Sequence, residues 1–353
     1  MEKRAYPMPE QIVPWFREKR KMLPWRMEPT PYHVWISEVM LQQTRIETVI
    51  PYYRRFLNEF PDAASLAAAD DDRLMKAWEG LGYYSRARNL KKAAAVITEA
   101  YGGELPSDVS LLRTLPGIGD YTAGAIASIA FGEAEPAVDG NVLRVCMRHI
   151  ASAEDVLSPK VRRAVAAELR AVYPTGEDAA LFTEGLMELG ETVCLPAGEP
   201  DCASCPLRDS CEAHRLNRTA DFPVRAEAKP RTQKAYTILV VRRGNTYAIH
   251  RRPKEGLLAG MWELPNLDGH LSAEEVGARL CSCGIEPLLI EPAGSATHIF
   301  THIEWHMTGY RVTVADGSDS PADSGWIWKT ADEIRRDHAI PTAFRAYTRL
   351  LQK

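Results

Sequence analysis

Four of the seven cysteines in this chain of 353 residues lie close together in its central part. Cys194, Cys202, Cys205 and Cys211 follow the pattern Cys-x7-Cys-x2-Cys-x5-Cys. Four thiolates at this spacing can ligate one metal ion or one cubane cluster, and the odd total argues against a framework of disulfides. The spacing alone leaves a zinc ion and a [4Fe–4S] cluster open, with four unligated structural thiols as a third alternative.

A turn rich in Pro and Gly is the second candidate site. It has the sequence Leu-Pro-Gly-Ile-Gly at residues 115–119 and is followed by a stretch of small residues with helical character. With a short helix beginning at Ser110, it predicts a helix-hairpin-helix motif. Gly117 and Gly119 permit a left-handed backbone and leave N–H groups exposed at a helix N-terminus, where they can bind a DNA phosphate. An ordinary turn between helices is the alternative.

The third candidate is Asp139, which lies directly before an expected helix and two residues before Asn141. In isolation, either side chain would be interpreted as a helix N-cap.

The elements that must position these residues change character along the chain. Up to residue 192, Pro and Gly separate stretches of helical periodicity, one of which, residues 34–50, predicts a single long helix. Beyond Cys211, a basic stretch with two prolines leads into β-branched and aromatic segments. The fold class is therefore predicted to be multidomain, an all-α domain followed by an α+β domain. The predicted parts are residues 1–217 with the cysteine loop 194–211, a linker at 218–235, and a second domain at 236–353.

Within the second domain, strands and helices are expected to alternate irregularly. The expected strands are 236–243, 246–252, 286–291, 298–305 and 307–314, and the expected helices are 273–283, 331–337 and 342–351.

Composition restricts the class of protein. With 45% hydrophobic and 25% charged residues the chain is globular, and its net charge of −4 does not by itself indicate a nucleic-acid partner. A site for a polyanion would have to be a local basic patch, such as residues 86–92. No apolar run approaches the ~18 residues of a membrane span, and no signal peptide is visible, so we expect a soluble cytoplasmic protein, nucleoid-associated if bacterial, with no membrane partner.

The order and spacing of the hairpin, Asp139 and the cysteine loop resemble the helix-hairpin-helix DNA glycosylases, in particular the branch of endonuclease III and MutY. Several further segments resemble MutY-type adenine DNA glycosylases. They are Leu-Pro-Trp-Arg at 23–26, Trp-Ile-Ser-Glu-Val-Met-Leu-Gln-Gln-Thr at 35–44 and Gly-Leu-Gly-Tyr-Tyr-Ser-Arg at 80–86. The resemblance implies a base-excision repair enzyme that flips adenine out of duplex DNA and hydrolyses its N-glycosidic bond. It also implies a [4Fe–4S] cluster on the four cysteines, although the first gap of seven residues is one longer than usual in that branch.

The second half of the chain resembles the Nudix-like domain of MutY, a relative of the MutT hydrolases. Leu-Leu-Ala-Gly-Met-Trp-Glu-Leu-Pro at 257–265 and the tripeptide Phe300, Thr301 and His302 carry this likeness. In relatives the tripeptide is typically Phe-Ser-His and reads 8-oxoguanine, and Thr301 keeps the hydroxyl. Because neither frame of a Nudix box is complete, pyrophosphohydrolase activity is not expected.

Cleavage of an adenine N-glycosidic bond requires an acid for the departing base and a negative charge near the oxocarbenium-like sugar. Glu38 lies among apolar residues, where burial would raise its pKa and suit it to protonate N7. Asp139, beside a helix N-terminus and Asn141, is expected to stay ionised and to stabilise or capture the cation.

The resemblance implies further contacts with DNA. Gln43 and Tyr83 match positions that intercalate around the lesion, and Trp25, Arg26 and Glu184 match positions that line the adenine pocket. Arg86 opens the basic patch that is expected to meet phosphate. For the two aromatic residues alone, packing in the core would be the simpler interpretation.

Two other functions compete with an adenine glycosylase acting opposite 8-oxoguanine or guanine. An endonuclease III-like glycosylase/lyase for oxidised pyrimidines would carry a Schiff-base lysine where this chain has Tyr121, and a phenol cannot form an imine. A non-catalytic iron–sulfur protein would not need both Glu38 and Asp139. The expected partner is therefore double-stranded DNA containing A:8-oxoguanine or A:G, bound by a monomer.

Overall fold

The computed structural model describes residues 6–227, 230–316 and 324–352. The chain forms two compact units, and both are discontinuous in sequence. One comprises Met1–Ala68 with Arg88–Glu227, and the other comprises Ala69–Ala87 with Ala228–Lys353. The division therefore differs from the predicted boundaries, because a segment from the helical half belongs to the second unit. No helix in the described ranges is long and apolar enough to cross a membrane.

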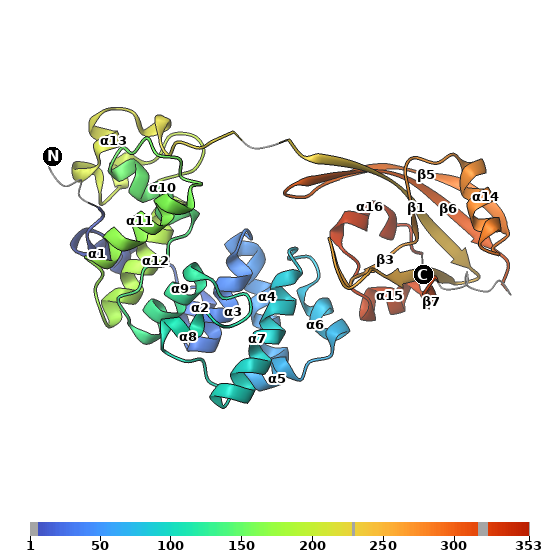
Figure 1. Cartoon of the computed structure of the whole chain (residues 1–353), viewed down its shortest axis with the longest axis horizontal. Helices are drawn as coiled ribbons and strands as arrows, with labels where there is room; N and C mark the ends of the chain where they lie inside the picture. Colours follow the sequence, from blue (N-terminus) through green and yellow to red (C-terminus); the bar gives the residue numbers. More distant parts are fainter. Residues whose placement is uncertain (1–5, 228–229, 317–323, 353) are drawn as a thin grey trace. The chain divides into compact units, whose positions relative to one another are not determined.

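The first unit is helical (Figure 1). Its helices are α1 (Pro9–Lys19), α2 (Pro24–Met27), α3 (Pro31–Leu41), α4 (Ile46–Glu59), α5 (Ala63–Ala67), most of α7 (Ser85–Tyr101), α8 (Val109–Leu112), α9 (Asp120–Phe131), α10 (Gly140–His149), α11 (Pro159–Arg170), α12 (Glu177–Thr192) and α13 (Glu212–Arg215). Short 3-10 turns occur at Cys202–Ser204, Arg208–Ser210 and Thr219–Asp221.

Helix α12 is central to this unit because it packs against α1, α9 and α10. Phe16 from α1, Met147 from α10 and Phe182 from α12 share one buried apolar cluster. Glycine allows one of these close approaches: a Cβ on Gly190 would lie 2.6 Å from the Cβ of Asn141. The start of α10, which carries Asp139 and Asn141, is thereby held directly on α12.

The long helix predicted for residues 34–50 is wrong, because the structure ends α3 at Leu41 and starts α4 at Ile46. The apolar periodicity continues across the break and so hides it. Gln43, in the intervening turn, has a left-handed φ of 59°. The turn presents an exposed Gln43 side chain instead of a continuous helix face.

The second unit is built on a seven-stranded sheet of order β3-β2-β1-β6-β5, with β4 paired to β1 and β7 paired to β2 (Figure 1). Its strands are β1 (Thr232–Arg243), β2 (Thr246–Arg251), β3 (Trp262–Glu263), β4 (Asn266–Asp268), β5 (Pro287–Ile299), β6 (Ile303–Val314) and β7 (Ile327–Thr330). Strands β1 and β6 are parallel, and the other pairs are antiparallel.

Alternate residues of β1 enter two separate cores on the two faces of the sheet. Ile238 and Val240 pack with residues of η4 (Thr342–Phe344) and α16 (Arg345–Thr348), whereas Leu239 and Val241 pack with α14 (Ala273–Ser282). Helix α15 (Ala331–Asp337) also contributes to the first of these cores and packs against α6 (Asp71–Trp78).

Three sequence expectations fail in this unit. The strand predicted for 298–305 is interrupted, because β5 ends at Ile299 and β6 begins at Ile303. The helix predicted for 342–351 is a 3-10 turn followed by one short helix. Strand β1 begins at Thr232, inside the expected linker, because its backbone pairs in register with β6 from Ile303 onward.

Candidate active site

An open pocket in the helical unit gathers the predicted catalytic residues. Its lining includes Glu38, Asp139, Tyr121 and Asn141, the predicted adenine-pocket residues Trp25, Arg26 and Glu184, and the predicted intercalating residue Gln43. These residues come from five separate places in the sequence, and the fold brings them together.

Glu38 lies on α3, where only 6% of the residue is exposed. Burial raises the pKa of Glu38 to about 7, with smaller contributions in the same direction from Glu184 and Asp139. The hydroxyl of Tyr121 donates a short hydrogen bond to Oε2 of Glu38 and acts in the opposite direction on this pKa. The expected elevation of the pKa is confirmed, and Glu38 can carry a proton near neutral pH.

Asp139 is the N-cap of α10 and also faces the pocket. Its Oδ1 accepts from the backbone N–H of Val142 at 2.7 Å, and its Oδ2 accepts from Nδ2 of Asn141 at 3.0 Å. The oxygen of the Asn141 amide in turn accepts from Arg144 at 2.7 Å. Capping and a role in the pocket are therefore compatible, and Asn141 orients the Asp139 carboxylate.

Two opposing influences act on the charge of Asp139. Burial raises the pKa of Asp139, whereas its hydrogen bonds with Val142 and Asn141 and the charge of Arg144 lower it. The sequence predicted only the stabilising helix terminus and missed the burial. The net pKa is raised, because burial disfavours the charged form of Asp139 more than these contacts favour it.

Arg26 pairs with two glutamates of α12, with Nε 2.7 Å from Glu184 and Nη2 2.9 Å from Glu188. Burial opposes its charge, but the two carboxylates raise the pKa of Arg26 above its usual value. Its guanidinium also lies 5.0 Å from the centre of the Phe16 ring. Arg26 is thus part of a buried ion cluster that shapes the pocket wall.

Glu188 was missed by the sequence reasoning, although its spacing of four residues from Glu184 places both on one face of α12. Gln42 was missed as well, and its Nε2 lies 3.3 Å from Oγ1 of Thr122 on α9. Trp25 is buried and packs edge-on against Tyr53 at 5.5 Å between ring centres. Trp25 therefore packs in the core and also lines the pocket.

The predicted hairpin connects α8 to α9. Gly117 has a φ of 79°, and a Cβ there would lie 2.7 Å from Cβ of Asn89, so the turn requires glycine. Gly119 does not use the left-handed backbone that glycine permits, because its φ is −93°; it serves as the N-cap of α9 without a side-chain cap. Gly119 leaves the start of α9 uncovered, as a phosphate contact would need.

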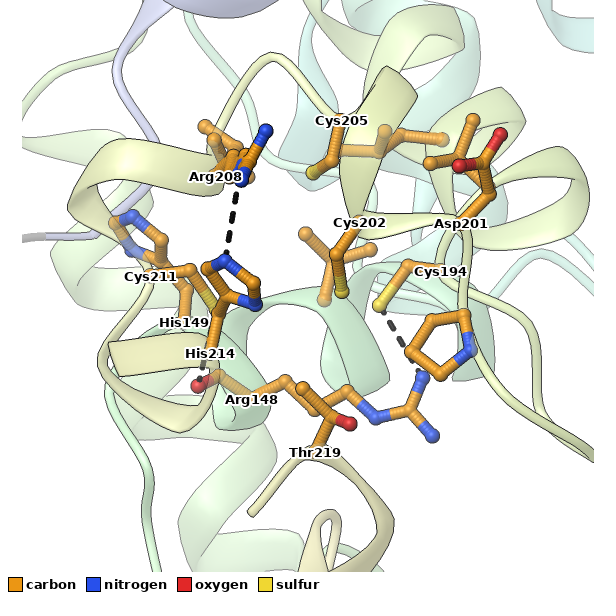
Figure 2. Close-up of a pocket in the computed structure, with 15 residues that line it drawn as sticks. Arg148, His149, Cys194, Asp201, Cys202, Cys205, Arg208, Cys211, His214 and Thr219 are labelled. Carbon is orange, nitrogen blue, oxygen red and sulfur yellow. Dashed lines mark hydrogen bonds between the residues drawn. The ribbon is translucent and has the colours of Figure 1, made fainter. Parts of the chain in front are cut away.

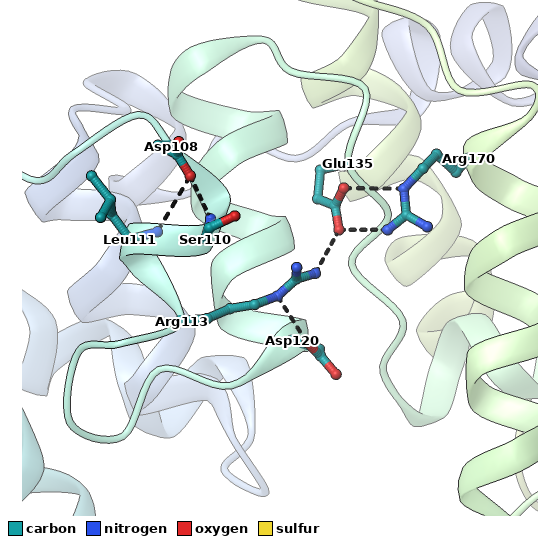
Figure 3. Close-up of polar contacts among 7 residues, drawn as sticks. All are labelled: Asp108, Ser110, Leu111, Arg113, Asp120, Glu135 and Arg170. Carbon is teal, nitrogen blue, oxygen red and sulfur yellow. Dashed lines mark hydrogen bonds and ion pairs between the residues drawn. The ribbon is translucent and has the colours of Figure 1, made fainter.

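Ion pairs brace this hairpin from both sides (Figure 3). Asp108 caps α8 by accepting from the backbone of Ser110 and Leu111. Arg113, at the end of α8, pairs with Asp120 at 2.8 Å and Glu135 at 2.9 Å. Arg170 of α11 shares Glu135 at 2.6 Å, which ties the hairpin to a third helix.

The remaining predicted DNA contacts lie in the second unit. Tyr83 has a left-handed φ of 46°, and its hydroxyl lies 3.0 Å from Oγ1 of Thr301. Thr301 and His302 are exposed in the turn between β5 and β6. A backbone hydrogen bond from the N–H of Phe300 to the carbonyl oxygen of Ile303 closes this turn. The ring of Phe300 packs on Trp305 at 4.9 Å. Phe300 therefore anchors the turn, and the next two residues face solvent.

Arg86 does not match the expectation of a surface contact with phosphate. It is 8% exposed, and it donates to the carbonyl oxygens of Leu81 at 3.0 Å and Gly82 at 3.2 Å. Burial lowers the pKa of Arg86 to about 10. The guanidinium supports the loop that carries Tyr83 from inside, because its carbon also lies 5.6 Å from the centre of that ring.

The four predicted metal ligands line one pocket (Figure 2). All four are free thiols of intermediate exposure. Arg148 donates to Sγ of Cys194 at 3.3 Å, and its carbonyl oxygen accepts from Sγ of Cys211 at 3.7 Å. Within the described ranges, no three Cys, His, Asp or Glu side chains are grouped so that they could hold a single metal ion.

Comparison with known proteins matches the two halves of the sequence to two different families. Residues 36–171 match the HhH-GPD superfamily of base excision DNA repair proteins, and residues 236–350 match the NUDIX domain. A thermostable thymine-DNA glycosylase of known structure is 26% identical, with a TM-score of 0.53 over 59% of this chain and 95% of that one. The fold is that of a helix-hairpin-helix DNA N-glycosylase with an appended Nudix-like domain.

Relatives that match most of the chain identify the kind of DNA glycosylase. The adenine DNA glycosylase of Mus musculus is 32% identical over 97% of this chain and 77% of its own length. That of Mycolicibacterium smegmatis is 38% identical over 63% of this chain and 73% of its own length. The chain belongs to the adenine DNA glycosylase family and is a base-excision repair enzyme that removes adenine from DNA.

Proposed function

We propose that the adenine removed by this enzyme is the one mispaired with 8-oxoguanine, or with guanine, in duplex DNA. The observation that carries the proposal is the exposed hydroxyl of Thr301, held against Tyr83 at 3.0 Å in the turn between β5 and β6. Guanine has a bare acceptor at N7, whereas 8-oxoguanine has an N–H donor there. A hydroxyl at this position can accept that donor, which suits it to recognise the oxidised base.

The helical pocket supplies the chemistry. Glu38 protonates N7 of the flipped adenine; because Tyr121 donates to Oε2, Oε1 is the oxygen available to carry the proton. Asp139, held by Asn141 and the start of α10, stabilises the oxocarbenium-like sugar or captures C1′ before water attacks. The wall of Arg26, Glu184 and Glu188 gives the pocket its shape.

The reaction ends at an abasic site without strand cleavage. A glycosylase/lyase needs an amine to form an imine with the sugar, and the described lining of the pocket contains no lysine. Tyr121 occupies the position where such a lysine would lie, and its hydroxyl is already hydrogen-bonded to Glu38. Wild-type enzyme should therefore release adenine without being trapped on DNA by borohydride. Efficient trapping would favour the endonuclease III-like alternative.

The cysteine pocket fits a [4Fe–4S] cluster. Four thiols line one pocket, and the resemblance to the endonuclease III and MutY branch favours a [4Fe–4S] cluster over one zinc ion. Cys194, Cys202, Cys205 and Cys211 would hold it, and its role would be to tie the loop after α12 into one structure. Purified protein should contain about four irons per chain. Stoichiometric zinc in active protein would contradict this.

The test of the function is a base-release assay under single-turnover conditions. Duplexes should carry adenine opposite 8-oxoguanine, guanine, cytosine or thymine, with thymine glycol opposite adenine as a probe for the competing pyrimidine activity. We expect the fastest release opposite 8-oxoguanine, slower release opposite guanine, and none of the oxidised pyrimidine. Equal rates for all four adenine duplexes would contradict the proposal.

A further inference from the structure

Helix α6 is attached to the sheet of the second unit by one acidic residue. Both carboxylate oxygens of Asp72 accept from the guanidinium of Arg251, at the end of β2. Oδ1 of Asp72 also accepts from the indole N–H of Trp262 on β3 at 3.0 Å. Arg251 lies 4.8 Å from the centre of the Trp262 ring, so each of the three side chains contacts the other two. We name these three residues the Asp72 cluster.

The other end of α6 is attached as well. Oε1 of Glu79 accepts from the backbone N–H of Ile340 at 2.9 Å, and Lys76 donates to the carbonyl oxygen of His338 at 3.4 Å. The ring of His338 packs edge-on against Trp262 at 4.7 Å. The two attachments therefore meet at the segment after α15, and α6 is held at its first and last turns.

The loop after α6 transmits this position to Tyr83. The indole N–H of Trp78 donates to the carbonyl oxygen of Gly82 at 3.1 Å, and Arg86 donates to the same carbonyl. The left-handed backbone of Gly80, Gly82 and Tyr83 fixes the path between these bonds. The position of α6 on the sheet therefore determines the position of the Tyr83 hydroxyl relative to Thr301.

The Asp72 cluster is poorly suited to be a source of stability. The side chains of Asp72 and Arg251 are 34% and 43% exposed, and ion pairs at such exposure contribute little to the free energy of unfolding. Neither residue lines the adenine pocket. What their geometry does supply is a fixed distance between α6 and two strands of the sheet, because Nη2 of Arg251 donates to both carboxylate oxygens of Asp72 and Trp262 donates to one of them, which restricts rotation of the Asp72 side chain.

That fixed distance matters for the hydroxyl of Thr301. When its hydrogen is donated to the oxygen of Tyr83, the hydroxyl presents only lone pairs to a base. In this state the hydroxyl accepts a hydrogen bond from N7–H of 8-oxoguanine. Against guanine, one of its lone pairs faces the lone pair of N7, and the two repel each other. If Tyr83 moves away, the hydroxyl can rotate and donate to guanine, and the two bases are no longer distinguished.

We propose that Asp72 and Arg251 are positioning residues for lesion recognition, which hold Tyr83 against Thr301 so that the Thr301 hydroxyl acts as an acceptor. This inference rests on the proposed preference for 8-oxoguanine and names the residues that set it. They act through Tyr83 and touch neither the adenine nor the reacting atoms.

The experiment compares adenine release from A:8-oxoguanine and A:G duplexes by the full-length enzyme. Asp72→Asn keeps an acceptor for Trp262 but removes the charge that holds Arg251. The ratio of kcat/KM for the two duplexes should fall about tenfold, the size expected when one charged hydrogen bond is lost. Arg251→Gln should lower the ratio to the same extent. The matched control is Glu291→Gln, which removes an exposed ion pair with Arg311 in the same unit and should leave the ratio unchanged.

Two further variants separate positioning from a structural role. Exchange of the charges, Asp72→Arg with Arg251→Asp, should restore most of the ratio that each single reversal loses. In a Tyr83→Phe background, Asp72→Asn should have no additional effect, because the contact it positions is already absent. Additive losses, failure of the exchange to rescue, or an unfolded Asp72→Asn protein would each overturn the inference.

The outcome for wild-type enzyme keeps the two proposals apart. If wild-type enzyme prefers A:8-oxoguanine and the Asp72 and Arg251 variants keep that preference, the inference falls and the proposed function stands. If wild-type enzyme shows no preference, the proposed function fails, and the inference fails with it.

Discussion

The adenine pocket and the turn at residues 300–302 handle their polar groups in opposite ways. In the pocket, Glu38 and Asp139 are enclosed, and Tyr121 and Asn141 already bind them. In the turn, Thr301 and His302 are exposed, and Tyr83 supplies one contact to the Thr301 hydroxyl. Chemistry needs charges that are fixed before substrate arrives, whereas recognition needs groups that can still form bonds with a base. Mutations in the two regions should therefore change different measured quantities.

The largest effect is expected for Glu38→Gln. The amide keeps the shape of the side chain but cannot donate an acidic proton, so adenine release should slow by about 100- to 10,000-fold. Duplex affinity should hardly change, which a binding titration beside single-turnover rates would show. Glu177→Gln, an exposed change in the first turn of α12, is the matched control. Release within tenfold of wild type at neutral pH would remove Glu38 as the acid.

Asp139→Asn should follow closely. Loss of the negative charge facing the sugar cation is expected to slow release by about 100- to 1,000-fold. The asparagine can still cap α10, so the melting temperature should change little, and circular dichroism during heating would check this. Unimpaired release by a folded variant would contradict the assignment of charge stabilisation to Asp139.

In the turn, Thr301→Ala combined with His302→Ala should leave the adenine chemistry intact. We expect the preference for A:8-oxoguanine over A:G to fall about tenfold, since two exposed hydrogen-bonding groups are lost. Thr308→Ala removes a hydroxyl bonded to His270 in the same unit and serves as the control. A fall in the rate for both duplexes by the same factor would show that the turn contributes to catalysis instead of recognition.

The smallest change is expected for Tyr121→Phe and concerns pH. In wild-type enzyme, release should slow as the pH rises through about 7, because Glu38 loses its proton with a pKa of about 7. The Tyr121 hydroxyl stabilises the carboxylate form, so its removal should raise the pKa of Glu38 and move the descending limb to higher pH. Rates measured from pH 5 to 9 would show the shift. Tyr173→Phe, a buried tyrosine bonded to Thr183, should leave the limb in place.

The sequence was informative where a single residue type was required. The sequence places Glu38, Asp139 and Tyr121 in one site, because their chemistry and the family resemblance agree, and all three line the same pocket. The boundaries of α14 and α15 lie within a residue of the prediction, since capping residues mark where both helices begin.

Errors arose where tertiary contacts override local pattern. No composition signal marks the break at Gln43, and the turn at Phe300 lies in a run of residues that suit a strand. The burial of Arg86 could not be inferred, because a basic residue beside other basic residues predicts an exposed face. Glu188 was detectable in principle from its spacing to Glu184, but an acidic partner for Arg26 becomes evident only when α2 and α12 are packed together.

The path of the chain between the two units also determines the order in which these units can fold. Asp72 and Arg251 are 179 residues apart, and Glu79 and Ile340 are 261 apart. Contacts of such sequence separation form late, because a long loop must close before they can be made. During synthesis, α6 emerges from the ribosome early, but its anchoring partners on β2, β3 and the segment after α15 emerge only after the whole helical unit. The recognition unit is therefore completed last, after the whole sequence of the helical unit has been released to fold.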